Sequence, residues 1–429
     1  MTDTQTTMLQ LPNGLRLIFD EMPGAQSCAV NLCIRSGLRY ESQALCGISH
    51  MMEHMLFKGT QTRTARELAE AADDLGASIN AYTSKEYTCV YIRTLPDHLG
   101  EMLGLLADML KNSKLAAEDL AMEKSVVAEE IAMYEDMPED LVFDLFYEMT
   151  WPGHMLGKNI LGTRETLKAM SSNDLRAHME RFFAPERMVL SVCGKFDAAQ
   201  LKARVEELFG NLQPSKEAAA ELGCEEELQA AVFTPGIKFT AKKAEQNQIV
   251  LAFPGCSNQD PRRYQAALLS TMLGGSTSSR LFQRLREELG LVYSVDFFNV
   301  HHCCEGISGV SMGLGAKTQC RALEEVVRVL HSFPEEVTAQ ELKRAQEQAA
   351  AGLVMGLESN AARASRSASN TLLLGKTMRV EESIAAYRAV TLEEIRAFAQ
   401  EMLAERSVLC VLGKFNHKTE RQMKELIEA

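Results

Sequence analysis

The chain has 429 residues, a formal net charge of −13 and a hydrophobic fraction of 46%. This length exceeds what one hydrophobic core usually serves, so we expect at least two domains, and the hydrophobic fraction excludes a disordered chain. The acidic balance disfavours nucleic acid as a partner. No run of 18 apolar residues occurs, so we expect no membrane partner either.

The 11 cysteines are scattered and often lie inside apolar runs, as in residues 27–34. An odd number in such positions is typical of buried thiols in a reducing compartment rather than of a disulfide framework. The first residues also lack the basic and then apolar regions of a secretory signal. We therefore expect a cytoplasmic protein.

In chain order, the first half begins with a predicted buried strand, SCAVNLCIRSG, at residues 27–37. An apolar helix with the sequence HMMEHMLFKGT follows at 50–60, and then an alternating strand region, GASINAYTSKEYTCVYI, at 76–92. Strong helix formers fill the segment 118–140, and the helix is expected to break at Pro138. A further strand and an amphipathic helix are predicted within 187–209.

The same order of elements returns in the second half. RMVLSVCGKFD from Arg187 and RSVLCVLGKFN from Arg406 agree at seven of eleven positions, 219 residues apart. Upstream, QNQIVLAFPGC and AALLSTMLGGS take the places of the first strand and the first helix. We therefore predict an α+β fold in which one unit is used twice. The predicted boundaries are a first half at 1–212, an acidic linker at 213–230 and a second half at 231–429.

A polar trio stands out in the first helix. His50 and His54 are four residues apart, so one helix face holds both imidazoles. Two such imidazoles can bind one Zn²⁺, and Glu53 beside them can take a proton from a water on the metal. This is the H-x-x-E-H arrangement. Histidines at this spacing also occur as ordinary core or surface residues, so the trio alone leaves both interpretations open.

A hydrolytic zinc needs a third protein ligand, and residues 118–140 offer candidates. Glu123 and Glu130 are seven residues apart and share one helix face, whereas Glu129 points about 100° away. We select Glu130 as the ligand and Glu123 as a second carboxylate near the site. The alternative is that both are exposed helix charges, as most glutamates are.

In the second half, Ala266, Leu269 and Ser270 take the positions of the polar trio. If His50, Glu53 and His54 served packing alone, aliphatic residues could have occupied these positions in both copies of the unit. We therefore expect the chemistry in the first half and a structural or substrate-holding role for the second.

Five motifs carry a resemblance to a known family. HMMEHMLFKGT, GASINAYTSKEYTCVYI, EKSVVAEEIAMYED, GHMLGKNILGT and RLFQRLREELGLVYSV, in this order, resemble the pitrilysin/insulinase family of zinc peptidases. The likeness is closest to its short bacterial members and to the catalytic subunit of mitochondrial processing peptidase, and it covers nearly the whole chain. It implies His50, His54 and Glu130 as zinc ligands. It also implies Glu53 as general base and Glu123 as a supporting catalytic residue.

The resemblance has further implications. Each half should be a sandwich of a mostly antiparallel sheet covered by helices, with the two halves around an enclosed chamber. Asn80 and Ala81 should lie on an edge strand that pairs with extended substrate. Arg286 and Tyr293 should approach the substrate near zinc, where they can stabilise an oxyanion. Short members usually pair, so we expect a homodimer or a heterodimer with an inactive homologue.

We therefore predict a zinc-dependent endopeptidase that hydrolyses short or unfolded peptides. In the processing peptidase, the partner subunit has a long glycine-rich loop, whereas this chain has only Gly274 and Gly275 at that place. This difference favours peptide degradation over presequence processing. The alternative function is a catalytically inactive structural or regulatory subunit. Such relatives lack one or more of the trio, which is complete here.

Overall fold

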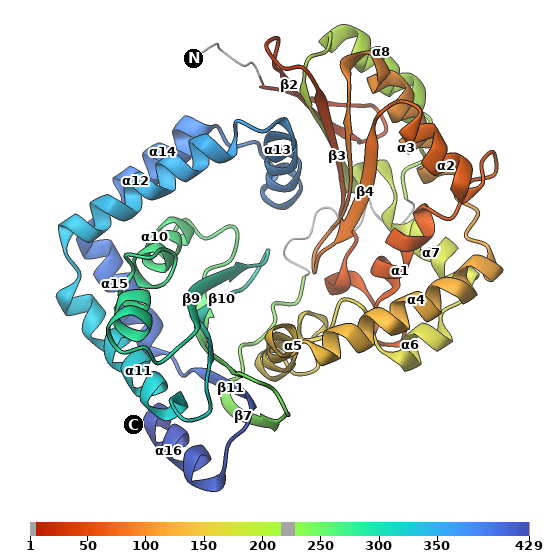
Figure 1. The fold of residues 1–429 in the computed structure, drawn as a ribbon. Coiled ribbons are helices and arrows are strands. Elements are labelled where there is room, and N and C mark those ends of the chain that lie inside the picture. Colours follow the sequence, from red (N-terminus) through yellow and green to blue (C-terminus); the bar gives the residue numbers. More distant parts are fainter. Residues whose placement is uncertain (1–5, 216–227, 429) are drawn as a thin grey trace. The chain divides into compact units, whose positions relative to one another are not determined.

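The computed structural model describes residues 6–215 and 228–428. These residues form two compact units, each built on one β-sheet (Figure 1). The described residues of the first unit fall within Met1–Ile131, Lys158–Leu228 and Met355–Met378. Those of the second fall within Ala132–Gly157, Gln229–Val354 and Arg379–Ala429. In the described part of the chain, no helix is long and apolar enough to cross a membrane.

The first unit contains a six-stranded sheet in the order β1-β2-β6-β3-β5-β4. Neighbouring strands are antiparallel except for the parallel pair β2 and β6. The strands are β1 (Thr6–Gln10), β2 (Arg16–Glu21), β3 (Cys28–Ile34), β4 (Ser78–Thr83), β5 (Thr88–Thr94) and β6 (Met188–Gly194). The helices are α1 (Ile48–Leu56), α2 (Ala65–Asp73), α3 (Leu99–Asn112), α4 (Ala117–Asp136, to Ile131 in this unit), α6 (Arg164–Ala169), α7 (Ser172–Phe182), α8 (Ala198–Phe209) and α13 (Asn360–Leu374).

The second unit contains a five-stranded sheet in the order β7-β11-β8-β10-β9, with β7 and β11 parallel and the other pairs antiparallel. The strands are β7 (Gly236–Ala241), β8 (Asn247–Gly255), β9 (Ser294–His301), β10 (Gly306–Leu314) and β11 (Val408–Gly413). The helices are α5 (Pro138–Thr150), α10 (Arg263–Leu273), a π-helical segment (Phe282–Glu288), α11 (Gln319–Glu336), α12 (Ala339–Gly356), α14 (Val380–Ala389), α15 (Leu392–Ala404) and α16 (His417–Glu428).

The two sheets share one topology. The order β2-β6-β3-β5-β4 in the first unit corresponds to β7-β11-β8-β10-β9 in the second, including the parallel pair. The segments matched in sequence, from Arg187 and from Arg406, form β6 and β11. The internal repeat and the α+β fold of mostly antiparallel sheets covered by helices are therefore confirmed.

Both faces of each sheet are covered, which explains why the central strands are mostly apolar. Side chains alternate between the faces of a strand. In β8, Ile249 and Leu251 belong to the core that contains α10, α11 and α15, whereas Val250 and Ala252 pack with α5. All seven residues of β3 are buried, because α13 covers the face opposite to the main core. A strand covered on both faces is apolar at most positions. The exception in β3 is Asn31, whose Nδ2 donates a hydrogen bond of 3.4 Å to Cys89 Sγ.

The units differ from the predicted halves, 1–212 and 231–429, because each half contributes a helix to the other half's sheet. Helix α5 lies early in the sequence but packs on β11 and β8, and α13 lies late but packs on β3 and β6. A helix pattern reveals an apolar face but not which sheet that face covers, so the contiguous boundaries need this correction. Of the predicted linker, 213–230, residues 216–227 lie outside the described residues.

Candidate metal centre

Helix α1 presents the two histidines on one face, and its start is fixed by a glycine and a buried carboxylate. Gly47 has a φ of +92°, and a Cβ there would lie 2.6 Å from the carbonyl oxygen of Leu161. The N–H groups of Gly47 and Ser49 donate to the two Glu41 oxygens at 2.7 and 2.9 Å. Glu41 thus satisfies N–H groups of the first turn, which the helix itself leaves without partners.

The methionines of α1 and its polar residues face different ways. Met51, Met52 and Met55 are fully buried in the core of the first unit. The imidazole rings of His50 and His54 stand one turn apart on the other side, with their centroids 4.6 Å apart. The apolar composition of the stretch therefore comes from its core face, and the two histidines are not part of the core.

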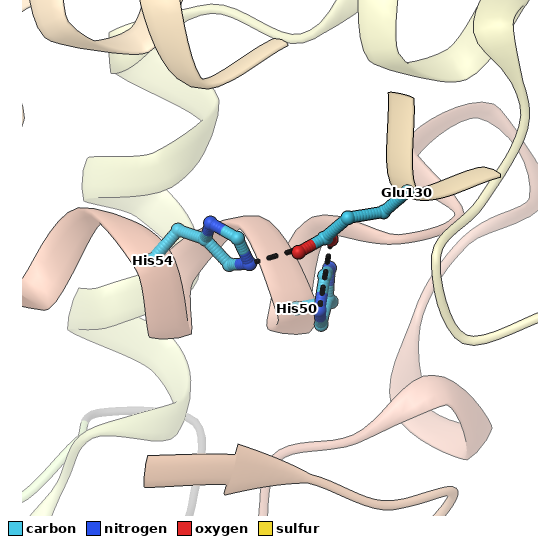
Figure 2. A group of neighbouring side chains, drawn as sticks. All are labelled: His50, His54 and Glu130. Carbon is cyan, nitrogen blue, oxygen red and sulfur yellow. Dashed lines mark ion pairs between the residues drawn. The ribbon is translucent and has the colours of Figure 1, made fainter. Parts of the chain in front are cut away.

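Glu130 on α4 completes a group of three donors (Figure 2). Its Oε2 atom lies 3.9 Å from His50 Nε2 and 3.7 Å from His54 Nε2. One ligand atom from each residue lies within 4.8 Å of the others. Glu129, which the helix geometry predicted to point away from the face of Glu123 and Glu130, is exposed. The structure thus brings together the three residues selected as ligands.

The donor set fits zinc. Two imidazole nitrogens and one carboxylate oxygen are the ligands of many hydrolytic zinc sites. Among the described residues, the buried Oε2 of Glu130 has no hydrogen-bond partner. Such an atom is costly to bury unless something else satisfies it, and a cation between the three donors would do so. Burial, together with the neighbouring His54 ring, also lowers the pKa of His50 to about 4, which favours the neutral form that a metal requires.

Glu123 lies behind the ligands rather than among them. Its Oε2 is 2.9 Å from His54 Nδ1, and its Oε1 is 2.5 Å from Lys58 Nζ. Burial alone would raise the pKa of Glu123, but the hydrogen bonds from Lys58 and His54 outweigh it and lower the pKa. An ionised carboxylate at Nδ1 keeps the proton on that nitrogen and leaves Nε2 with its lone pair for a metal.

Glu53 stands beside the three donors and is not one of them. Thr83 Oγ1 donates a hydrogen bond of 2.6 Å to its Oε2. Burial raises the pKa of Glu53, and the nearby Glu130 charge adds to this, whereas Thr83 and His54 partly offset it. A carboxylate with a raised pKa is a better proton acceptor near neutral pH than an ordinary one.

The strand that holds Thr83 is also the edge of its sheet. Within residues 6–215 and 228–428, strand β4 pairs with β5 alone and lies last in the strand order. Asn80 is exposed, and its Oδ1 accepts a hydrogen bond of 2.8 Å from the N–H of Ala81. The edge position expected for Asn80 and Ala81 is confirmed, and their pairing with substrate stays a prediction.

Arg286 and Tyr293 belong to the second unit. The Arg286 guanidinium lies 4.9 Å from the ring centroid of Phe282. Tyr293 donates its backbone N–H to the carbonyl oxygen of Gly313, and 71% of the residue is exposed. Their approach to the zinc ligands stays a prediction.

Sequence reasoning missed Thr83, Lys58 and Glu41. Lys58 is four residues after His54, a spacing that can continue one helix face, and this was the available signal. Thr83 had no such signal, because its partner Glu53 lies 30 positions away and only the fold brings the two together. Glu41 lies six and eight positions before its partners Gly47 and Ser49, so its signal was local and was overlooked.

Comparisons with known proteins show the family of the chain. Residues 16–164 match the family profile described as insulinase (peptidase family M16), and residues 169–349 match the peptidase M16 inactive domain. The chain is 37% identical to the uncharacterized zinc protease YmxG of Bacillus subtilis, over 94% of this chain and 96% of that protein. The chain belongs to the insulinase family of zinc peptidases, M16. Its cofactor is zinc, and its length is that of the short bacterial members.

Other relatives extend the comparison. An uncharacterized zinc protease of Streptomyces coelicolor is 33% identical over 97% of this chain and 91% of that protein. The crystal structure of a protease from Helicobacter pylori superposes with a TM-score of 0.86 at 19% identity, covering 96% of this chain and 100% of that one. At this identity the likeness supports the fold alone.

Proposed function

We propose that this protein is a zinc-dependent endopeptidase that hydrolyses short or unfolded peptides in an enclosed chamber. The observation that carries the proposal is the convergence of His50, His54 and Glu130, with Glu53 beside them and left free of the ligand set. This is the division of roles that metal-assisted hydrolysis needs, since the ligands hold the cation and a separate carboxylate moves the proton.

Each side chain then has a stated task. His50, His54 and Glu130 would hold the zinc, which when bound would supply Lewis-acid polarisation and a lowered pKa of water. Glu53 accepts the proton of the attacking water at its carboxylate and later gives it to the leaving amine. Thr83 orients Glu53 through the hydrogen bond at Oε2. Glu123 fixes the ring of His54 through Nδ1.

The edge strand supports the proposed substrate class. An extended peptide can add to the free edge of β4 through backbone hydrogen bonds, with Asn80 and Ala81 at the point of contact. Such pairing reads the backbone, so a folded substrate would first have to expose an extended segment. The exposed side chain of Tyr293, with Arg286, is proposed to stabilise the oxyanion.

The alternative, a catalytically inactive subunit, has one observation in its favour. The second matched profile is described as an inactive domain. It covers α10, where Ala266 and Leu269 are buried and Ser270 Oγ donates a hydrogen bond of 2.6 Å to the Phe297 carbonyl oxygen. These residues offer no metal donors. The first half keeps the complete set, so we favour the active enzyme.

Assembly and location complete the proposal. We propose a dimer, either of two copies or with an inactive homologue, by analogy with short family members. A cytoplasmic location is supported by buried thiols such as Cys33 and Cys89, which face each other across β3 and β5 and form no disulfide.

The test uses the purified protein with one equivalent of zinc and two substrates of the same sequence, one folded and one unfolded by reduction. We expect cleavage of the unfolded form only, loss of cleavage with a chelator, and its return on adding zinc. Zinc-bound protein that cleaves neither substrate would favour the inactive subunit.

A further inference from the structure

Lys58 occupies a fixed position at the end of α1. Its N–H donates to the carbonyl oxygen of Met55, and Gly59 then turns the chain with a φ of +109°. A Cβ at Gly59 would lie 2.9 Å from the carbonyl oxygen of Arg63, so the turn requires glycine. The cation of Lys58 therefore lies at the C-terminal end of the helix that carries both histidine ligands, where the helix dipole favours positive charge.

The ammonium group of Lys58 meets a carboxylate that is withdrawn from solvent. Lys58 Nζ lies 2.5 Å from Glu123 Oε1, and the exposed fraction of the Glu123 side chain is 6%, against 33% for Lys58. A buried carboxylate without a counter-charge is costly, because little water remains to solvate it. Lys58 supplies the counter-charge from the side that water still reaches.

The other carboxylate oxygen of Glu123 forms a hydrogen bond with His54, one of the three zinc ligands of the proposed site. Its Oε2 accepts the hydrogen bond of 2.9 Å from His54 Nδ1. The contacts thus form a chain from Lys58 through Glu123 to His54, whose Nε2 faces Glu130 at 3.7 Å. A carboxylate held at both oxygens has one orientation, and it transmits that orientation to the imidazole.

We propose that Lys58 is a positioning residue of the zinc centre, which holds Glu123 so that His54 presents Nε2 to the metal and thereby sets the affinity for zinc. The inference rests on the zinc centre of the proposed function, and it concerns metal binding rather than peptide cleavage. A purely structural ion pair would stabilise the fold and leave the zinc affinity unchanged once folding is complete, so the two roles are separable.

The test measures the zinc dissociation constant of the full-length apoprotein by competition with a chromophoric chelator. Lys58→Met should bind zinc about 10 times more weakly than the wild type, at the lower end of the effect of losing a direct partner of a ligand, because Lys58 acts on His54 only through Glu123. Lys58→Arg, which keeps the charge, should restore affinity to within about threefold. Lys58→Gln serves as a second neutral variant and should weaken zinc binding in the same direction.

A matched control and a double-mutant cycle complete the design. Lys202→Met breaks an exposed lysine–glutamate pair elsewhere in the first unit, with Nζ 3.4 Å from Glu206, and should leave the zinc affinity unchanged. In a Glu123→Gln background, Lys58→Met should cause less than about a threefold further loss, because its effect passes through Glu123. Thermal unfolding of each apoprotein confirms that the compared variants are folded.

Three results would overturn the proposal: wild-type affinity in folded Lys58→Met, equal losses in the Met and Arg variants, or a full additional loss in the Glu123→Gln background. Wild-type protein that binds no zinc would overturn the metal centre and this inference together. Zinc-bound wild type without peptidase activity would remove the proposed function and leave the role of Lys58 in place.

Discussion

Thr83 Oγ1 donates a hydrogen bond of 2.6 Å to Oε2 of Glu53. This contact joins the edge strand β4 to the residue proposed to move the proton. The strand proposed to hold the peptide backbone therefore also orients the carboxylate that acts on it. In the proposed function, substrate pairing and proton transfer would therefore depend on one strand, an arrangement that favours precise positioning.

The first prediction concerns this hydrogen bond. Thr83→Val removes the hydroxyl with little change of shape, and we expect kcat/KM to fall about tenfold or more, as for the loss of a hydrogen bond to a charged group. Zinc content should not change, because Thr83 touches no ligand atom. Thr83→Ser retains the donor and serves as the control. Activity of the Val variant within about twofold of wild type would contradict the assigned role.

The second prediction separates two adjacent glutamates. Glu130→Gln should weaken zinc binding by more than about 100-fold, since it removes a ligand rather than an outer partner. Glu129→Gln changes the exposed neighbour on the same helix and should bind zinc like the wild type. Equilibrium dialysis of both variants measures the difference. Equal zinc binding by the two would mean that the third ligand lies elsewhere.

The third prediction concerns His178, a buried histidine on α7. Its Nε2 lies 2.9 Å from Ser36 Oγ, and burial, with Arg181 nearby, lowers its pKa to about 3. Between pH 6.5 and 3 the unfolded chain binds a proton at this residue and the folded chain does not. The free energy of unfolding should therefore fall with decreasing pH, by at most about 1.4 kcal/mol per pH unit from this residue.

The measurement compares the zinc-free wild type with His178→Gln, so that release of metal adds nothing to the slope. The variant should be less stable near neutral pH and should lose stability less steeply as the pH falls below 6.5. Parallel curves for the two proteins would show that His178 titrates normally in the folded state.

The fourth prediction tests the attachment of α13 to the first sheet. Arg363 donates to both oxygens of Asp20, at 2.7 and 3.0 Å, and Asp20 is buried. Arg363→Met leaves that carboxylate unpaired and should cost about 3–5 kcal/mol of unfolding free energy. Arg66→Met, at an exposed pair with Glu70, should cost less than about 1 kcal/mol. Similar costs in urea unfolding would show that the α13 contact is unimportant for stability.

Much of the metal centre was predictable because its signals are local. The spacing of His50 and His54 defines one helix face, and the seven-residue spacing of Glu123 and Glu130 defines another. What local spacing does not give is the meeting of the two helices, which came from resemblance to the family. The different roles of Glu123 and Glu130 were also predicted, but only the folded contacts show that Glu123 meets Nδ1 of His54 while Glu130 faces Nε2.

The internal sequence repeat predicted much of the fold, as the local spacings predicted much of the metal centre. The matched segments at Arg187 and Arg406 both form inner strands of their sheets, and the segment predicted as the first strand of the first half forms β3. The sequence did not predict that α5 packs on the second sheet and α13 on the first, because the pattern of an amphipathic helix does not indicate which sheet it covers. Lys58 was missed for a related reason, since its partner lies 65 positions away on α4.

The most direct test of the account is the Glu53→Gln variant. It keeps the shape of the side chain and the three ligands but removes the proton acceptor. We expect it to bind one equivalent of zinc with wild-type affinity and to cleave an internally quenched unfolded peptide at least about 1,000 times more slowly. Zinc-loaded Glu53→Gln with wild-type turnover would contradict the assignment of Glu53 as the general base.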